Sequence, residues 1–411
     1  MSEILPQPDF EILFVSHKYP PATGGMEKQS FELIEGVSKL TKVHHILFQR
    51  EESIFMFFWK LNKRILNKIK AHPNIRLIHF NDGLIASLSL RHKGYTHLQK
   101  ALTLHGLDVV FPLRYFQHKI VPQFEKFDLI IAVSHATADA IIRRGIPAEK
   151  IVIVPNGVDN RLARGSQNIS NKENVMRKYP QLNLNQPYLL TLGRPVKRKG
   201  FSWFINDVIP LIPQDVQLVL AGPFQRKTTF FERFIDLLPK KYYQLITLFL
   251  GYPSDEKAIR SLLKQPSINR QVKHLGKVAF DDLQILLANA TAFLMPNIYV
   301  DGDMEGFGLV CLEASISGTL VLASEIEGIT DAIQHHKNGI LLTSKDPIAW
   351  RNQIQQVLSN PDDYRQLAQE YREYTIQHYD WDKMAISYFD AFKAIVKSNV
   401  ALTRRHSETV F

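Results

Sequence analysis

Short apolar runs alternate with helical and turn segments along most of the chain, and they predict two series of strands. The first series covers residues 12–16, 45–48, 77–80, 102–105, 129–134 and 151–155, and the second covers 188–192, 216–221, 272–275, 292–295, 320–323 and 340–342. Runs of this length that are apolar at consecutive positions are typical of strands buried on both faces. Strands that alternate with helices favour parallel sheets, so we expect two α/β domains with ligands beyond the carboxyl ends of the strands.

A polar gap over residues 160–186 separates the two series and is the expected linker. It divides the chain into a first domain over residues 1–180 and a second domain over residues 181–378. A terminal helix is predicted over residues 379–400, and one apolar face of this helix must dock on a domain. The apolar residues that recur at helical spacing in it are Trp381, Met384, Tyr388, Phe392 and Ile395.

Composition narrows the class of protein. A chain of 411 residues with 45% hydrophobic residues is globular and large enough for two or three cores. The single cysteine, Cys311, cannot close an intrachain disulfide and excludes a zinc site built from several thiolates. The N-terminus lacks the basic and then apolar pattern of a secretory signal, and no apolar run approaches the roughly 20 residues of a membrane-spanning helix. We therefore expect a cytoplasmic protein.

The net charge of +10 is concentrated in the first half of the chain. Residues 1–186 contain 25 Lys and Arg against 16 Asp and Glu, whereas the remainder contains 25 against 24. A basic half can face nucleic acid, an anionic membrane or an acidic substrate, and charge alone does not choose among them. No recognised nucleic-acid-binding motif accompanies the charge, so we expect no nucleic-acid partner.

The segment EGFGLVCLE places Glu305 and Glu313 on either side of Gly306 and Gly308. If the chain is helical from Leu309, a rise of 1.5 Å per residue puts the two carboxylates roughly 12 Å apart. A glycosidase pair requires about 5 to 9.5 Å, so we expect these glutamates to hold the two ends of an extended ligand. The helix N-terminus between them is a natural seat for a phosphate. On the spacing alone, two solvated glutamates beside a turn remain the alternative.

A basic loop, GRPVKRKG, directly follows the predicted strand at 188–192. Arg194 offers a planar fork of donors and Lys199 a compact charge, and together they can neutralise a leaving diphosphate without a metal. A solvated basic loop is the alternative for these residues.

Two further segments follow predicted strands of the first domain. In HKYPPATGG, Gly24 and Gly25 lead from a strand into a helix and could cradle phosphate or sugar, although the spacing is not the dinucleotide-binding G-x-G-x-x-G. In TLHGLD, His105 could bind a sugar hydroxyl or stabilise transient charge. Ordinary turn glycines and a buried structural histidine are the respective alternatives.

The stretch NIYVDGDM contains a D-x-D pattern, Asp301 to Asp303, which can chelate a divalent ion beside a diphosphate. We expect no bound metal, because Arg194 and Lys199 already supply the countercharge and the stretch is typical of a surface loop.

Taken in order, these segments resemble the retaining, nucleotide-sugar-dependent glycosyltransferases of family 4. The resemblance extends over nearly the whole chain, and its fragments are PPATGGMEKQS, TLHGLD, FDLIIAVSHATADAII, IVIVPNGVD, LGRPVKRKG and MPNIYVDGDMEGFGLVCLEASISGT. It implies the GT-B fold, with two Rossmann-like domains, a cleft between them and a terminal helix that crosses back to the first domain. It also implies sugar transfer with retention, usually discussed as front-face attack assisted by the leaving phosphate, with no cofactor and no metal.

The resemblance implies roles for residues of the second domain. Glu305 matches the glutamate that contacts the donor sugar, and Glu313 matches the one that binds the ribose hydroxyls. Phe307, Gly308 and Leu309 match the backbone amides beside the diphosphate.

It also implies a cationic clamp and residues of the first domain. Arg194 and Lys199 match the clamp on the diphosphate, Gly24 and Gly25 match the loop that meets the phosphates, and His105 matches the histidine near the reacting carbon. His105, Glu305, Arg194 and Lys199 are therefore the expected catalytic group.

The chain departs from the family pattern at three positions. Leu320 stands where the family often has Pro, Asn297 where Ser is usual, and Glu327 where Gly is common beside Gly328. A carboxylate at Glu327 could face the phosphates and change the local geometry of the donor site.

The segment over residues 54–70 suggests a membrane partner. It contains five Lys and Arg and no acidic residue, and as a helix it is amphipathic. Such a helix can lie on an anionic membrane, which fits a lipid-linked or glycan acceptor, or it can pack on its own domain with a solvated basic side. The residues of its expected apolar face are Ile54, Phe57, Phe58, Leu61, Ile65 and Ile69. A second aromatic and basic stretch, residues 226–250, is expected to be a packed helical pair or another surface contact.

The expected function is transfer of a hexose-type sugar from a nucleoside-diphosphate donor to a glycan or glycolipid acceptor, in the synthesis of cell-surface polysaccharide or lipopolysaccharide. A sugar-nucleotide 2-epimerase on the same fold would need the diphosphate contacts but no acceptor. A non-catalytic nucleotide- or glycan-binding relative is the other alternative, and the presence of Glu305, Glu313, Arg194 and Lys199 argues against it.

Overall fold

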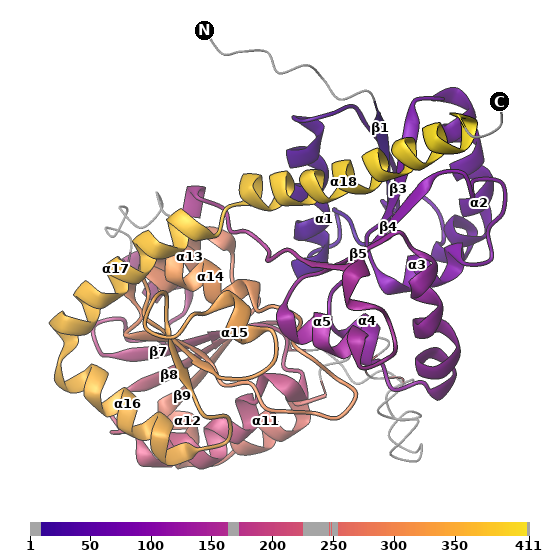
Figure 1. Cartoon of the computed structure of the whole chain (residues 1–411). Coiled ribbons are helices and arrows are strands. Elements are labelled where there is room, and N and C mark those ends of the chain that lie inside the picture. The colour runs from indigo at the N-terminus through magenta and orange to yellow at the C-terminus, as the bar shows by residue number, and fades with distance from the viewer. Residues whose placement is uncertain (1–9, 163–171, 225–245, 247, 249–253, 409–411) are drawn as a thin grey trace, which may run out of the picture. The chain divides into compact units, whose positions relative to one another are not determined.

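The chain folds into two compact units, each built around a parallel sheet (Figure 1). The first unit comprises Met1–Gly157 with Asp380–Phe411, and the second comprises Val158–Tyr379. The computed structural model describes residues 10–162, 172–224, 246, 248 and 254–408. The stretch expected to be a helical pair, residues 226–250, lies outside the described residues apart from positions 246 and 248.

Within the described residues, the first unit has a six-stranded parallel sheet in the order β2-β1-β3-β4-β5-β6. Its strands are β1 (Glu11–Ser16), β2 (Val43–Leu47), β3 (Ile75–Phe80), β4 (Gln99–Leu104), β5 (Leu129–Ala132) and β6 (Ile151–Ile153). Each strand overlaps a predicted apolar run, and the central strands are buried at most positions, as an apolar run without alternation predicts. The main helices of this unit are α1 (Gly25–Ser38), α2 (Ile54–Ala71), α3 (Gly83–Ser89), α4 (Leu107–Val110), α5 (His135–Ile142) and α18 (Trp381–Glu408).

The described part of the second unit repeats this plan, with strand order β12-β11-β10-β7-β8-β9. Its strands are β7 (Tyr188–Leu192), β8 (Gln217–Ala221), β9 (Val272–Gly276), β10 (Ala292–Met295), β11 (Val321–Ser324) and β12 (Ile340–Leu342). Two Rossmann-like units with parallel sheets confirm the predicted fold class. The α-helices described here are α7 (Lys172–Lys178), α8 (Phe201–Trp203), α11 (Glu256–Leu262), α12 (Pro266–Gln271), α13 (Phe280–Asn289), α14 (Leu309–Ile316), α15 (Ile329–Ala332), α16 (Pro347–Ser359) and α17 (Pro361–His378).

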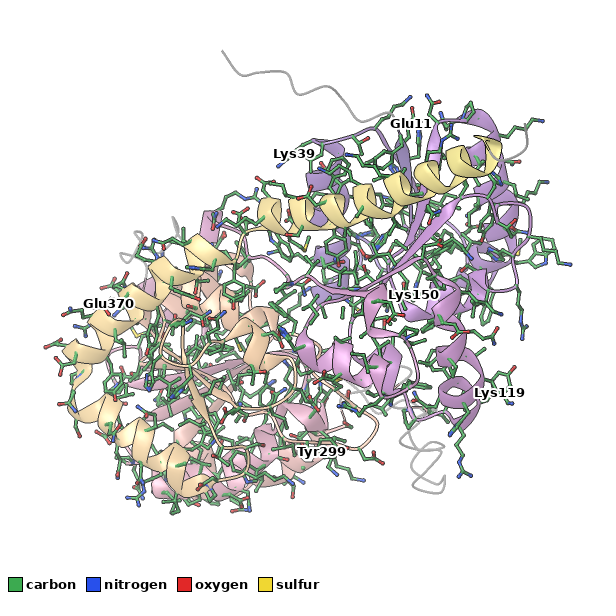
Figure 2. The ribbon with its side chains drawn as sticks, in the orientation of Figure 1. Glu11, Lys39, Lys119, Lys150, Tyr299 and Glu370 are labelled. Carbon is green, nitrogen blue, oxygen red and sulfur yellow. The ribbon has the colours of Figure 1, made fainter. Side chains whose placement is uncertain are left out.

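The terminal helix α18 returns to the first unit and packs against α1. The two helices approach so closely at Gly36 that a Cβ there would lie 2.4 Å from the Cβ of Ala385. The Tyr388 hydroxyl is buried and accepts hydrogen bonds from Gln29 (3.1 Å) and Thr103 (3.2 Å). At the start of the helix, Asp382 pairs with Lys39, labelled in Figure 2. The predicted docking of this helix on the first domain is confirmed.

The segment expected as a linker contains α7. Val175 on this helix is buried in the core of the second unit, together with Leu182 and Leu184. The apolar residues of the segment are too widely spaced to give a clear periodicity, yet they cover one face of the second sheet.

Helix α2 packs its apolar face on its own unit. Phe57, Leu61 and Ile65 are buried in the core of the first unit, and Phe58 and Ile69 pack against that core. Of the two alternatives for this apolar face, the structure shows packing on its own domain, so the face is covered by protein. Among the described helices, none has both the length and the apolar composition needed to cross a bilayer.

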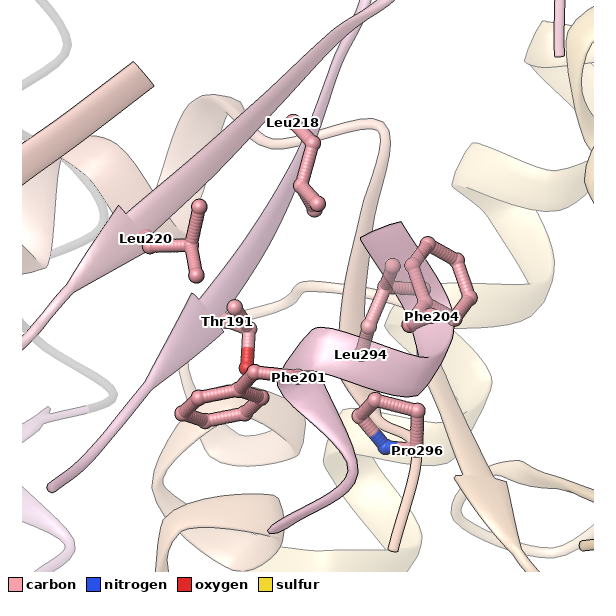
Figure 3. Close-up of a pocket in the computed structure, with 7 residues that line it drawn as sticks. All are labelled: Thr191, Phe201, Phe204, Leu218, Leu220, Leu294 and Pro296. Atoms are coloured by element: carbon pink, nitrogen blue, oxygen red, sulfur yellow. The ribbon is translucent and has the colours of Figure 1, made fainter. Parts of the chain in front are cut away.

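A small apolar space beside β7 contains one buried hydroxyl. Figure 3 shows Thr191 among Phe201, Phe204, Leu218, Leu220, Leu294 and Pro296. Among the described residues, the Thr191 hydroxyl has no hydrogen-bond partner, and the space is too narrow to admit a water molecule. A buried hydroxyl without a partner destabilises the folded state.

We expect Thr191→Val to stabilise the second unit by about 1 kcal/mol, because valine keeps the shape and removes the unbonded hydroxyl. Urea unfolding, followed by the fluorescence of Trp203 and Trp350, measures the change. Thr319→Val is the matched control: the Thr319 hydroxyl is equally buried but donates to the Leu287 carbonyl at 2.6 Å, so this variant should lose stability. A loss of stability in both variants would contradict the prediction.

Candidate functional site

Two loops of the second unit meet at one edge of its sheet. Strands β7 and β10 are parallel neighbours, so their carboxyl ends lie side by side. The loop after β7 contains the turn Lys197–Lys199, and the loop after β10 leads through Glu305 to α14. Gly200 has a φ of 66°, and a Cβ there would lie 2.0 Å from the Pro296 carbonyl, so glycine permits the close contact of the two loops.

Glu305 is held by two cations at this junction. Its Oε2 lies 2.8 Å from Lys199 Nζ and 3.3 Å from Arg198 Nε, and it accepts a third contact from Asn297 Nδ2 at 3.3 Å. Burial alone would raise the pKa of Glu305, but the charges of Lys199 and Arg198 outweigh burial and lower it to about 2. The carboxylate is therefore ionised at physiological pH. It can accept hydrogen bonds from sugar hydroxyls, and it cannot act as a general acid.

The segment from Glu305 to α14 presents backbone amides. Gly308, the residue before α14, has a φ of 91°, a left-handed conformation that glycine favours. No side chain caps α14 among the described residues. The Cys311 N–H already donates to the Gly308 carbonyl at 2.9 Å, so the amides that α14 can offer an anion are those of Leu309 and Val310. Phe307 is buried, Leu309 begins the helix, and Glu313 lies half-buried within it. Glu305 and Glu313 thus lie on either side of the amide-bearing turn.

Arg194 is exposed at the start of the other loop, immediately after β7. Lys199 is 8% exposed, and its ammonium also lies 3.5 Å from the Met295 sulfur. The structure thus brings Lys199 to Glu305 and places Arg194 on the same loop, nearer solvent.

Glu327 lies against the backbone of Glu305. Its Oε2 accepts a hydrogen bond from the Glu305 N–H at 2.7 Å, and the Gly328 N–H donates to the Glu305 carbonyl at 3.1 Å. Glu327 has a φ of 51°, where glycine would be unstrained. Burial raises the pKa of its carboxyl to about 7, which outweighs the lowering effect of the Glu305 amide. Glu327 therefore changes its charge near neutral pH.

The predicted residues of the first unit lie beyond β1 and β4. Gly24 and Gly25 are exposed at the start of α1, next to the Glu27 carboxylate. His105 follows β4, and its Nε2 lies 2.8 Å from the Asn81 carbonyl. Because a carbonyl only accepts, Nε2 carries the proton, and in the neutral ring Nδ1 is the acceptor nitrogen. Asp108 fixes this turn by accepting from the His105 N–H at 2.9 Å.

The sequence analysis missed two pairs of polar residues. His17 Nδ1 lies 2.9 Å from the buried Asp82 carboxylate, beyond the ends of β1 and β3. In the second unit, Arg198 lies 3.2 Å from Asp303. The positions of His17 and Asp82 directly after predicted strands were a usable signal. The signal for Asp303 was obscured by the D-x-D pattern: Asp301 is exposed, but Asp303 is 5% exposed, so the expectation of a surface loop is wrong for Asp303.

Glu11, His44 and His72 form the group of metal-ligand types found among the described residues. They lie at the start of β1, in β2 and after α2, respectively. The two imidazole rings are stacked, with centroids 3.8 Å apart and planes at 23°. Lone pairs in nearly parallel ring planes do not converge on one ion, and the Glu11 carboxylate already pairs with Lys42 at 3.1 Å. This arrangement is typical of a stacked, hydrogen-bonded pair rather than a metal centre.

Two models of known protein families together match most of the chain. The family described as Glycosyl transferases group 1 matches residues 172–374, and the family described as Glycosyltransferase Family 4 matches residues 2–162. A D-inositol 3-phosphate glycosyltransferase from Corynebacterium urealyticum is 30% identical over 184 residues, which are 43% of this chain and 41% of that protein. A putative colanic acid biosynthesis glycosyltransferase from Salmonella typhimurium is 24% identical over 66% of this chain and 58% of its own length. The chain thus spans less than two thirds of these curated relatives.

Solved structures share the fold over nearly the full length. Anabaena HepE in complex with UDP superposes with a TM-score of 0.70 at 18% identity, over 94% of this chain and all of that chain. Sucrose-phosphate synthase from Thermosynechococcus elongatus gives a TM-score of 0.69 at 19% identity, over 95% of this chain and all of that one. Both family matches and the two-sheet architecture agree: the chain belongs to the group 1 glycosyltransferases of family 4, which have the GT-B fold.

Proposed function

We propose that the protein is a retaining glycosyltransferase that moves a hexose-type sugar from a nucleoside-diphosphate donor to a glycan or lipid-linked acceptor, in the synthesis of a cell-surface polysaccharide or lipopolysaccharide. The observation that carries the proposal is the ionised Glu305, held by Lys199 beside the uncapped start of α14. Relatives named for colanic acid and amylovoran biosynthesis support the acceptor class. HepE, which has been solved with UDP-glucose, supports a nucleotide-sugar donor.

The second unit supplies the proposed donor site. Glu305 accepts hydrogen bonds from hydroxyls of the transferred sugar, and Glu313 binds the ribose. Arg194 and Lys199 neutralise the diphosphate, and the amides of Phe307, Gly308 and Leu309 add hydrogen bonds. For the first unit, we propose that the turn at Gly24 and Gly25 and the His105 imidazole face the reacting groups, as the family resemblance implies.

The proposed chemistry depends on charge stabilisation and positioning. The bond between the sugar anomeric carbon and the phosphate oxygen breaks, and its electron pair stays on the diphosphate. The acceptor oxygen bonds to the same face of that carbon, and its proton passes to the departing phosphate. Fixed cations and amides that face the leaving group stabilise the charge that develops there. No step requires an acidic side chain, which is consistent with the low pKa of Glu305.

The donor site predicts which variants lose nucleotide binding. Thermal unfolding is measured with UDP, GDP, ADP and CMP for the wild type, Lys199→Ala and Glu313→Ala. One nucleotide at a hundredfold excess over its dissociation constant should stabilise the wild type by roughly 2.7 kcal/mol and should stabilise neither variant. Lys197→Ala is the matched control, because Lys197 is exposed in the same turn. If no nucleotide stabilises the wild type, the proposed function is wrong.

Glu327 predicts how nucleotide binding depends on pH. Glu305, Asp303 and Arg198 are the charged groups around Glu327, and its own pKa of about 7 means that it gains a negative charge between pH 6 and pH 8. The added charge repels a diphosphate bound at the adjacent amides, so the affinity of the wild type should fall severalfold as the pH rises.

Titration calorimetry at pH 6, 7 and 8 tests this prediction with the nucleotide that stabilises the protein. Glu327→Gln should remove the additional fall in affinity, and the comparison between variants cancels the titration of the nucleotide itself. Glu325→Gln, at an exposed neighbouring position, is the control and should behave like the wild type. Identical pH profiles for the wild type and Glu327→Gln would contradict the prediction.

Helix α2 offers a proposed contact with the cytoplasmic face of a membrane, although not through its predicted face. Phe55 and Trp59, one turn apart, are 82% and 79% exposed, and the exposed Lys63 continues the same stripe. Aromatic rings followed by basic residues on one side of a helix suit the interface of an anionic bilayer. The contact would bring the protein to a lipid-linked acceptor.

Trp59 allows a direct test, because the other tryptophans, Trp203, Trp350 and Trp381, are buried or half-buried. Vesicles that contain phosphatidylglycerol should shift the tryptophan emission to the blue and float the protein, whereas vesicles of phosphatidylcholine alone should do neither. Phe55→Ser with Trp59→Ser should abolish flotation.

The matched control replaces two exposed aromatic residues of the second unit, Phe280→Ser with Tyr299→Ser, and should float normally. Failure of the wild type to bind anionic vesicles, or normal flotation of the α2 variant, would disprove the membrane contact.

A further inference from the structure

Arg198 bridges two carboxylates beside the proposed donor site. Its Nη1 lies 3.2 Å from Asp303 Oδ1 and 3.3 Å from Asp303 Oδ2, and its Nε lies 3.3 Å from Glu305 Oε2. The three side chains are between 4% and 17% exposed. A planar guanidinium can hold two carboxylates in a fixed relative position, which an ammonium cannot do.

The far end of this bridge is anchored in the backbone. Asp303 Oδ1 accepts from the Met304 N–H at 2.9 Å, and the Asp303 N–H donates to the Val300 carbonyl at 3.0 Å. The backbone of Arg198 is tied to the same loop, because its carbonyl accepts from the Ile298 N–H at 2.8 Å. Arg198 therefore connects Glu305 to a fixed point, and it does not simply follow the movements of Glu305.

The Lys199 ammonium has two partners in the proposed function, Glu305 and the donor diphosphate. In this structure its ammonium lies 2.8 Å from Glu305. In the proposed function the same ammonium neutralises the donor diphosphate, which draws it away from the carboxylate. When that happens, the contacts with Arg198 and Asn297 remain, and Arg198 is the charged group of the two that holds Glu305 in position.

The balance of charges indicates that the contact between Arg198 and Glu305 affects the orientation of Glu305 rather than the net charge of the site. Arg198 and Asp303 contribute one positive and one negative charge, so together they leave the net charge of the site unchanged. Lys199 and Glu305 also balance each other. The Arg198–Asp303 pair therefore adds no net attraction for a diphosphate, and what it adds is a fixed orientation of Glu305.

We propose that Arg198, anchored by Asp303, is a positioning residue that fixes Glu305 for the hydroxyls of the donor sugar while Lys199 binds the diphosphate. This inference rests on the proposed function, and it assigns separate tasks to adjacent cations. Arg198 governs recognition of the sugar, and Lys199 governs recognition of the diphosphate.

The test compares a nucleotide with its sugar conjugate. Titration calorimetry measures the binding of UDP and UDP-glucose, GDP and GDP-mannose, and ADP and ADP-glucose to the full chain. The variants are Arg198→Met, Asp303→Asn, the double variant with both changes, and Arg198→Lys. The double variant keeps the charges balanced and leaves no buried charge without a partner, so it guards against loss of folding. Lys197→Met removes a cation from the same turn without touching the carboxylates and is the control.

We expect the double variant to bind the nucleoside diphosphate like the wild type and to lose roughly tenfold or more in affinity for the sugar conjugate, as expected for lost charge-assisted hydrogen bonds. Arg198→Lys should keep little of the affinity for the sugar conjugate, because an ammonium with rotatable donors does not fix the relative position of the two carboxylates. The inference is wrong if the double variant binds the sugar conjugate as tightly as the wild type. Any loss of affinity in the single variants would then come from their unbalanced charge. It is also wrong if the nucleotide and its conjugate lose affinity equally. If the wild type binds none of the six ligands, the proposed function fails, and the inference fails with it.

Discussion

The ion pair between Lys199 and Glu305 is the interaction on which the proposed donor site depends. The two residues are 106 positions apart in the sequence, and they meet because β7 and β10 are parallel neighbours whose carboxyl ends lie at one edge of the sheet. The pair is 2.8 Å long and nearly buried, so each charge is stabilised by the other rather than by water. Loss of either partner would leave a buried charge, which explains why Asn297 and Arg198 also contact the carboxylate.

The sequence predicted the strands best where both faces of the sheet are covered. The limits of β7 and β10 coincide with the predicted runs, because both strands are central and apolar at nearly every position. β4 starts with the half-buried polar residues Gln99 and Lys100, so its predicted run, which begins at residue 102, starts three residues late. Hydropathy therefore locates the buried part of a strand and not its solvated ends.

The site was harder to predict, because the orientation of a side chain depends on turns that composition does not reveal. Lys197, Arg198 and Lys199 are consecutive cations, yet Lys197 is exposed while the other two contact Glu305. The 3-10 turn formed by these three residues determines which of their side chains point toward Glu305. The amphipathic pattern of α2 was equally ambiguous: it correctly predicted one apolar face, but a pattern of that kind does not say whether protein or lipid covers the face.

The affinity of the loop for an anion depends on more than its number of cations. The loop after β7 carries four cations, Arg194, Lys197, Arg198 and Lys199, and the loop after β10 carries three carboxylates, Asp301, Asp303 and Glu305, so the two loops together have one net positive charge. Ionisation of Glu327 offsets that last charge as well. Burial keeps the Glu327 carboxyl partly protonated near neutral pH, and the uncharged form does not repel a diphosphate. The backbone of Glu327 has a positive φ, a strained conformation that glycine would adopt without strain. In the proposed donor site, Glu327 makes the affinity for a diphosphate sensitive to pH, which glycine at the same position could not do.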